Sequence, residues 1–251
     1  MKPVLTIAVS THGQRLDAVT KWTFDPRVAY LLLWQQPGSQ ALAWPENVSV
    51  VCLPGQGVTR SRNAAIERCR TDWLWFMDDD VEVPTASIDA LLHELRTRSA
   101  GEILIGSVVQ PDGCVSSGLA EGRAYGRREI LSIGTIQVIV NAPWVREHGL
   151  RFPLRLGAGS PYPVCDEPVF LARALRAGAR ITQVGGVSVV HGAASSGQGL
   201  DRPELIRSRA IAFREIFGMP LCVLASTWFG LRHARAIGRH WPWLFRYAPA
   251  D

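Results

Sequence analysis

The chain has 251 residues, of which 47% are hydrophobic and 20% charged, so it can bury a full core and is too apolar for a disordered protein. Its net charge of +5 comes from 25 arginines and two lysines, and guanidinium groups favour phosphate or carboxylate ligands. No nucleic-acid recognition motif, membrane-spanning run or signal peptide accompanies this charge, and the five scattered cysteines indicate reduced thiols in a cytoplasmic protein.

Short apolar runs alternate with helical patterns in the first half of the chain, which predicts an α/β fold with a mostly parallel sheet. We expect strands at residues 4–10, 28–34, 48–53, 73–77 and 102–109. A helix should begin near Thr59 or Ser61, either of which could cap it, and run to about residue 70. A second helix is expected over residues 85–98.

The second half is predicted to contain a polar, glycine-containing loop, then strand, helix, helix and strand. We expect these five elements at residues 114–129, 135–140, 142–149, 166–178 and 179–192. From residue 201 the chain is helical and basic. We therefore predict a domain over residues 1–200, with its halves divided near residue 110, and a tail over residues 201–251.

Three aspartates, Asp78, Asp79 and Asp80, end the hydrophobic run WLWFM. Adjacent carboxylates repel one another, so this arrangement indicates a cation or a hydrogen-bonding ligand at the end of the strand. Strand alternation predicts Asp78 and Asp80 on one side, where they could share a divalent cation, and Asp79 on the other. The alternative is a solvated turn that caps the next helix.

Other candidate residues are weaker by themselves. The segment GVTRSRNAAI (residues 57–66) gathers donors and arginines at a helix start, which suits a diphosphate or a well-capped surface helix. Asp166 and Glu167 begin another helix, and they could either supply a general base or cap the helix. His191 and His12 each follow a strand. Each could be a ligand in a binding site or an ordinary hydrogen-bonded residue.

Taken in chain order, these segments resemble glycosyltransferase family 2, whose members are sugar-nucleotide-dependent enzymes of the GT-A fold. The resemblance rests on TIAVSTHGQR, GVTRSRNAAIERCRTDWLWFMDDDVEVP, the stretch from GLRFPLRLGAG to the helix DEPVFLARALRAG, and VVHGAASSG, and it covers residues 2–197. It implies an inverting, metal-dependent hexosyl- or deoxyhexosyltransferase.

The resemblance also implies roles for individual residues. Asp78 and Asp80 match the D-x-D motif and would hold Mn²⁺ or Mg²⁺, with His191 approaching the metal. The nucleotide-sugar would be bound by the first-strand loop, the end of the second strand, the helix start and the acidic run, that is, by Thr11, His12, Arg15, Gln35, Arg62, Asn63, Asp78 and Asp79.

Two departures from the family pattern leave alternatives open. The acceptor-side motif usually reads Gly-Glu-Asp, and here Cys165, Asp166 and Glu167 occupy it, so either acid could be the general base. Many members end the second strand in an aspartate that helps read the base of the nucleotide. Gln35 and Gln36 stand there instead, so the nucleotide stays open, with UDP- and dTDP-sugars as the first expectations.

The tail combines eight arginines with Trp228, Phe229, Trp241, Trp243 and Phe245. It is predicted to lie on an anionic membrane surface, at the inner face of the cell membrane, or to pack on protein. The acceptor would be a saccharide or a lipid-linked molecule in bacterial surface polysaccharide synthesis. The competing hypotheses are a nucleotidyltransferase of similar fold and a non-catalytic protein that binds nucleotide-sugars or glycans.

Overall fold

The computed structural model of the chain describes residues 3–38, 42–192, 200 and 202–247. The expected α/β fold with a mostly parallel sheet is confirmed, and in sheet order the strands run β3-β2-β1-β4-β7-β5-β6, with β8 pairing β5. Within the described residues the eight strands are β1 (Leu5–His12), β2 (Ala29–Gln35), β3 (Val48–Leu53), β4 (Trp73–Asp78), β5 (Glu102–Val109), β6 (Val115–Ser117), β7 (Val138–Asn141) and β8 (Arg180–Val190).

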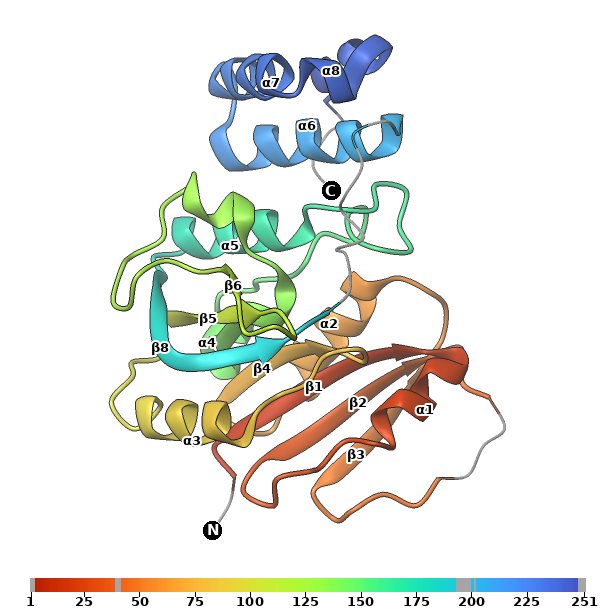
Figure 1. Cartoon of the computed structure of the whole chain (residues 1–251), viewed down its shortest axis with the longest axis vertical. Helices are drawn as coiled ribbons and strands as arrows, with labels where there is room; N and C mark the ends of the chain where they lie inside the picture. Colours follow the sequence, from red (N-terminus) through yellow and green to blue (C-terminus); the bar gives the residue numbers. More distant parts are fainter. Residues whose placement is uncertain (1–2, 39–41, 193–199, 201, 248–251) are drawn as a thin grey trace.

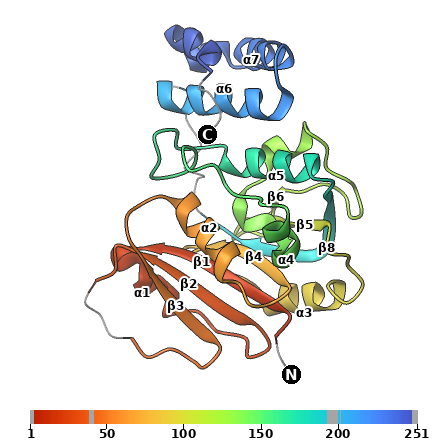
Figure 2. The ribbon, with the colours of Figure 1, turned by 180° about the vertical axis from the view of Figure 1, so that it is seen from behind.

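Helices cover both faces of this sheet (Figures 1 and 2). The helices are α1 (Leu16–Val19), α2 (Val58–Arg68), α3 (Thr85–Glu94), α4 (Ala142–Glu147), α5 (Asp166–Arg176), α6 (Pro203–Phe217), α7 (Leu221–Arg232) and α8 (Ala234–Ile237). Short 3-10 turns are η1 (Gly13–Arg15), η2 (Glu129–Ser132), η3 (Thr135–Gln137) and η4 (Gly238–Phe245). None of the helices in the described ranges is long and apolar enough to cross a bilayer.

Strand β4 shows how the sequence pattern produces the two cores. Its side chains alternate between the faces of the sheet, as the period of a strand requires. Trp75 and Met77 pack with residues of α1 and α3, whereas Leu74 and Phe76 pack with residues of α2, α4 and α5. Because both faces are buried, β4 is a continuous apolar run rather than an alternating one.

The carboxyl ends of the parallel strands β1, β2 and β4 lie side by side. Ser10 of β1 is in register with Asp78 of β4, and His12 is in register with Gln35 of β2. The strand pairing therefore gathers residues from three predicted candidate segments at one edge of the sheet, where open α/β folds bind ligands.

Three local expectations are wrong. Helix α2 begins at Val58 with Gly57 as its N-cap, so Thr59 and Ser61 lie inside the helix and do not cap it. The strand expected at residues 135–140 is instead Val138–Asn141, because Thr135–Gln137 form a 3-10 turn. The expected loop at 114–129 contains the short strand β6 and the beginning of η2.

The C-terminal helices stack on α5, at the end of the molecule opposite β1–β3 (Figure 1). Ile211 and Ile216 of α6 join the core shared by α2, α4 and α5. A smaller cluster of Ile206, Ile237 and Leu244 joins α6 to α8 and η4. The expected helical character after residue 201 is confirmed, and α6 lies between α5 and the outermost layer that α7 and α8 form (Figure 2).

Candidate active site

The aspartate run lies at the end of β4, and its three side chains have different surroundings. Strand β4 ends at Asp78, so the alternation expected from the sequence does not extend to Asp80. Asp79 is buried, and it shares the guanidinium of Arg15 with Asp80, whose Oδ2 lies 2.9 Å from Nη2 of Arg15. Asp78 instead has Arg62 as its cationic neighbour, at 3.8 Å.

His191 lies beside this run because of a strand-like bridge. The backbone groups of Glu82 and Val190 exchange two hydrogen bonds, of 3.0 and 2.9 Å, which hold the segment after the aspartates against the end of β8. The next residue, His191, then places its Nε2 3.7 Å from Oδ1 of Asp80. The structure thus brings together the carboxylate and the imidazole that were predicted as metal ligands.

The chemistry of these side chains fits a hard divalent cation. Burial raises the pKa of Asp78, and the negative charges of Asp80, Glu167 and Asp79 raise it further, against the lowering effect of Arg62. A cation beside Asp78 and Asp80 would relieve that repulsion. In the described part of the chain, no group of three or more His, Cys, Asp or Glu side chains is arranged to hold a metal, so the metal role stays a prediction.

Arg62 lies at the centre of the acidic side chains. It is 5% exposed, and its guanidinium contacts Asp166 and lies 3.2 Å from Oε1 of Glu167 and 3.8 Å from Oδ1 of Asp78. Its carbon Cζ lies 5.7 Å from the ring centre of Phe152. One buried cation therefore joins the acid at the end of β4 to both acids at the start of α5.

The two acids of α5 differ in exposure and in protonation. The Asp166 side chain is 3% exposed, and burial together with the charge of Glu167 raises the pKa of Asp166 to about 7. The Glu167 side chain is 17% exposed. Burial alone would raise the pKa of Glu167, but Arg62 and a hydrogen bond from the Thr135 hydroxyl outweigh that effect and lower it.

Helix α2 and the segment before α5 pack against each other through glycines. The amide of Val58 donates to the carbonyl of Ala158 over 2.9 Å, so the first donor of α2 is already used. A Cβ on Gly157 would lie 2.9 Å from the carboxyl group of Asp166 and from Thr59. This close approach covers the start of α2, where the sequence pattern allowed a diphosphate to bind. It also fixes the position of Asp166.

Asn63 also connects α2 to the chain segment before α5. Its side-chain amide donates to the Phe152 carbonyl over 3.0 Å, and its carbonyl oxygen accepts from the Phe152 amide over 2.8 Å. The side chain therefore fastens α2 to the segment that carries Phe152. Its predicted contact with the nucleotide-sugar stays a prediction.

The remaining predicted nucleotide-binding residues lie along the edge of β1 and β2. Thr11 and Gln35 are buried, at 3% and 5% exposure. His12 is partly exposed, and its Nε2 lies 3.2 Å from the side-chain nitrogen of Gln56. Thr11, His12 and Gln35 are thus close to the aspartate run in the sheet, while Asp166 and Glu167 approach it through Arg62.

Sequence reasoning missed Thr135 and Gln56. Thr135 lies in η3 and donates to Glu167, 32 positions away, and Gln56 precedes α2 and contacts His12. Neither residue belongs to a motif. The sequence signal at Thr135 is only that a polar residue stands just before an apolar strand. This arrangement is too common to indicate a site.

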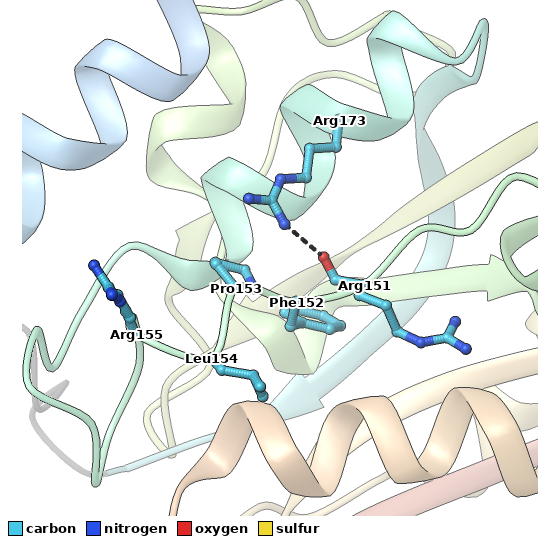
Figure 3. Close-up of a pocket in the computed structure, with 6 residues that line it drawn as sticks. All are labelled: Arg151, Phe152, Pro153, Leu154, Arg155 and Arg173. Atoms are coloured by element: carbon cyan, nitrogen blue, oxygen red, sulfur yellow. Dashed lines mark hydrogen bonds between the residues drawn. The ribbon is translucent and has the colours of Figure 1, made fainter. Parts of the chain in front are cut away.

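A separate hollow of about 390 Å³ lies beside α5 (Figure 3). It is lined by Arg151, Phe152, Pro153, Leu154, Arg155 and Arg173. Arg173 donates to the Arg151 carbonyl over 3.3 Å and lies 3.5 Å from Glu215, and Arg151 lies 3.4 Å from Glu67. Phe152 lines this hollow and also lies under the guanidinium of Arg62.

Comparisons with known proteins agree with this geometry. Residues 35–129, which include α2, β4 and the aspartate run, match the model of the family described as glycosyl transferase family 2. A comparison with curated protein sequences finds no match. Many solved structures share the fold, and several of them are crystal structures of S. aureus TarS.

The TarS structures are similar to this chain in fold and distant in sequence. The structure of TarS 1–349 has 15% identity and a TM-score of 0.60, and the match covers 86% of this chain and 66% of that one. The same fragment in complex with UDP-GlcNAc has 16% identity and a TM-score of 0.58, covering 86% and 68%. The match covers 40% of a longer TarS structure and 66% of TarS 1–349, so this chain spans less than two thirds of either.

The expected family resemblance and fold are confirmed by these matches. Residues 35–129 thus resemble glycosyl transferase family 2, and the chain shares the GT-A fold of the TarS structures.

Proposed function

We propose that the protein transfers a sugar from a nucleoside-diphosphate sugar to a hydroxyl group of a saccharide or lipid-linked acceptor, with inversion at the anomeric carbon. The observation that carries this proposal is the Arg62 contact set. Arg62 lies between Asp78, on the donor side, and Glu167, on the acceptor side. A donor at the end of β4 and an acceptor at the start of α5 would thus meet at one place.

A UDP-sugar is the first candidate donor. Two of the similar solved structures are TarS complexes with UDP-GlcNAc and with UDP, each near 15% identity to this chain. Thr11, His12 and Gln35, at the ends of β1 and β2, would contact the nucleotide. A dTDP-sugar is the second candidate, because Gln35 replaces the aspartate of many family members.

A divalent cation, Mn²⁺ or Mg²⁺, would be held by Asp78 and Asp80 with His191 beside them. When bound, it would supply Lewis-acid stabilisation of the charge on the departing diphosphate. Arg15 would keep Asp79 and Asp80 in place through its contacts with both carboxylates.

Glu167 is the better candidate for the general base. It is more exposed than Asp166, and the charge of Arg62 together with the Thr135 hydroxyl keeps it ionised. Its carboxylate would accept the proton of the acceptor hydroxyl as that oxygen bonds to the anomeric carbon. The bond from this carbon to the diphosphate oxygen breaks, and its electron pair leaves with the nucleoside diphosphate. Asp166, buried against Arg62, would position that guanidinium.

The product class we propose is a bacterial surface polysaccharide or a lipid-linked oligosaccharide, made in the cytoplasm. A lipid-linked acceptor would bring the enzyme to the inner face of the cell membrane. Contact through the C-terminal helices is part of this proposal.

A thermal-shift panel tests the donor site. UDP, GDP, dTDP and CMP are each added with and without Mn²⁺ to the wild type and to Asp80→Ala. A nucleotide at a hundred times its dissociation constant should stabilise the protein by about 2.7 kcal/mol. We expect a metal-dependent shift with UDP that Asp80→Ala lacks. A metal-dependent shift with dTDP alone would replace UDP as the donor, and no shift with any nucleotide would contradict the donor site.

A turnover assay separates catalysis from mere binding. Purified protein is incubated with radiolabelled UDP-sugar and a lipid-linked acceptor fraction. We expect release of UDP by the wild type and none by Glu167→Gln. Equal and slow UDP release by both proteins, with donor binding intact, would favour a non-catalytic binding protein.

A further inference from the structure

Exposed apolar side chains gather in the C-terminal helices. The described residues include ten large hydrophobic side chains that are exposed, and six of them lie between residues 219 and 245. These six are Met219, Leu221, Leu224, Trp228, Leu231 and Phe245. A soluble protein rarely leaves such a group uncovered without a partner for it.

Four of these side chains form a stripe along one face of α7. Leu221, Leu224, Trp228 and Leu231 follow one another at intervals of three and four residues, the spacing of one helix face. They are 51–68% exposed. The opposite face, with Cys222, Ser226 and Gly230, is buried, and a Cβ on Gly230 would collide with Trp241. The stripe therefore faces away from the protein.

The surroundings of the stripe are basic. Residues 221–247 contain Arg232, Arg235, Arg239 and Arg246 and no aspartate or glutamate. All four arginines are exposed. The guanidinium of Arg232 lies 5.5 Å from the ring centre of Trp228, so cation and apolar stripe are adjacent on the same helix. Arg232 lies in α7 and Arg235 in α8, the helices of the outermost layer (Figure 1).

Other parts of the tail are unsuited to such a contact. Helix α6 is covered on one side by α5 and on the other by α7 and η4. Trp241 and Trp243 pack partly buried against the cluster of Ile206, Ile237 and Leu244 rather than outward. The sequence pointed to the whole basic and aromatic segment, whereas the structure leaves one helix face available.

We propose that α7 lies in the surface of an anionic lipid bilayer, with its apolar stripe among the acyl chains and the arginines on the lipid headgroups. This inference deepens the proposed function, on which it rests for a lipid-linked acceptor. A second copy of the chain fits the face less well. A two-fold contact would bring the same arginines together without an acid from this segment to pair with them. Anionic headgroups supply the missing charge.

Vesicle co-sedimentation of the full chain tests the proposal. We expect binding to phosphatidylglycerol vesicles, weak binding to phosphatidylcholine vesicles, and a decrease of binding with salt. The double variant Leu224→Asp, Trp228→Asp should lower binding to phosphatidylglycerol vesicles by roughly tenfold or more. Val115→Asp is the matched control, because Val115 is 67% exposed in β6 and should bind as the wild type does.

A second variant and a second measurement keep the outcomes distinct. Arg232→Glu, Arg235→Glu, Arg239→Glu should reduce binding to phosphatidylglycerol vesicles while leaving the melting temperature near that of the wild type. No vesicle binding by the wild type, or equal binding by the wild type and the stripe variant, would overturn the proposal. So would a dimer, seen by light scattering, that the stripe variant converts to monomer. A UDP-dependent thermal shift retained in the stripe variant shows that its donor site is intact, so the two proposals fail separately.

Discussion

The guanidinium of Arg62, on α2, contacts the carboxylate of Asp166, the first residue of α5, across 104 positions of sequence. Both side chains are almost entirely buried, at 6% and 3% exposure. Burying an isolated charge is very costly, so each of the two depends on the other. The same guanidinium lies near Glu167 and Asp78, and it is thus the only cation in ion-pair range of three acids in the described part of the site.

Removing Arg62 should destabilise the fold. Arg62→Met leaves the buried Asp166 and the partly exposed Glu167 without a counter-charge, and we expect a loss of about 3–5 kcal/mol of unfolding free energy in urea titrations at pH 8. Arg60→Met is the matched control on the same helix, since Arg60 is exposed, and its effect should stay within about 0.5 kcal/mol. Equal effects of the two variants would refute a structural role for the Arg62 ion pairs.

Replacing the two acids of α5 should separate their roles. Glu167→Gln should lower kcat roughly 10²–10⁴-fold, because the amide cannot accept the acceptor proton, while UDP binding by calorimetry stays unchanged. Asp166→Asn should lower kcat less, because it acts through the position of Arg62. Glu147→Gln, at an exposed site on α4, should behave as the wild type. A larger loss in Asp166→Asn than in Glu167→Gln would assign the base to Asp166 instead.

The layers of the fold could be predicted from the sequence because they depend on local periodicity. The run Trp73–Met77 is strand-like whatever it packs against, and Asp78 must then stand at a strand end. The position of Asp80 could not be predicted, because it depends on where β4 stops and on Arg15, which follows β1. The helix start at Gly57 was missed for a similar reason, since it is Ala158, 100 positions later, that accepts from Val58.

The residue types of the site could be predicted from the sequence, but the contacts between their side chains could not. Strand order brings Asp78 next to Ser10, and the family resemblance points to Arg62 and Glu167. The contact of Arg62 with Asp166, and that of Thr135 with Glu167, depend on how α2, α5 and η3 pack in three dimensions. Local propensity carries no information on such contacts.

The pH dependence of kcat/KM should identify the base. The pKa of Glu167 is lowered, so it stays ionised below the ordinary glutamate value, whereas burial raises the pKa of Asp166 to about 7. We therefore expect no loss of kcat/KM attributable to the base between pH 8 and about 5, with folding verified by circular dichroism at each pH. An acid limb near pH 7 that disappears in Asp166→Asn would indicate Asp166.

Stability should vary with pH in the direction set by Asp166. Its pKa is higher in the folded protein than in the unfolded chain, so the folded state binds the extra proton between the two values. The free energy of unfolding should consequently be higher at pH 5.5 than at pH 8, and the difference should shrink in Asp166→Asn. Glu167 is ionised in both states over this interval and does not contribute. Urea titrations at the two pH values measure the effect, and an identical pH dependence of wild type and Asp166→Asn would contradict it.

Gly157 should be the least replaceable glycine of the site. Its φ of +93° is strained for any other residue, and a Cβ there would lie 2.9 Å from both Asp166 and Thr59. Gly122→Ala is the matched control, because its φ of +74° carries the backbone strain without any atom within 4 Å. We expect Gly157→Ala to cost about 1–3 kcal/mol more unfolding free energy than Gly122→Ala, which is the usual cost of overpacking. Because the collision displaces Asp166 from Arg62, kcat should fall in Gly157→Ala alone. Equal stability and equal kcat in the two variants would show that the contact between α2 and α5 can yield without consequence, and the Arg62 arrangement would then lose its structural basis.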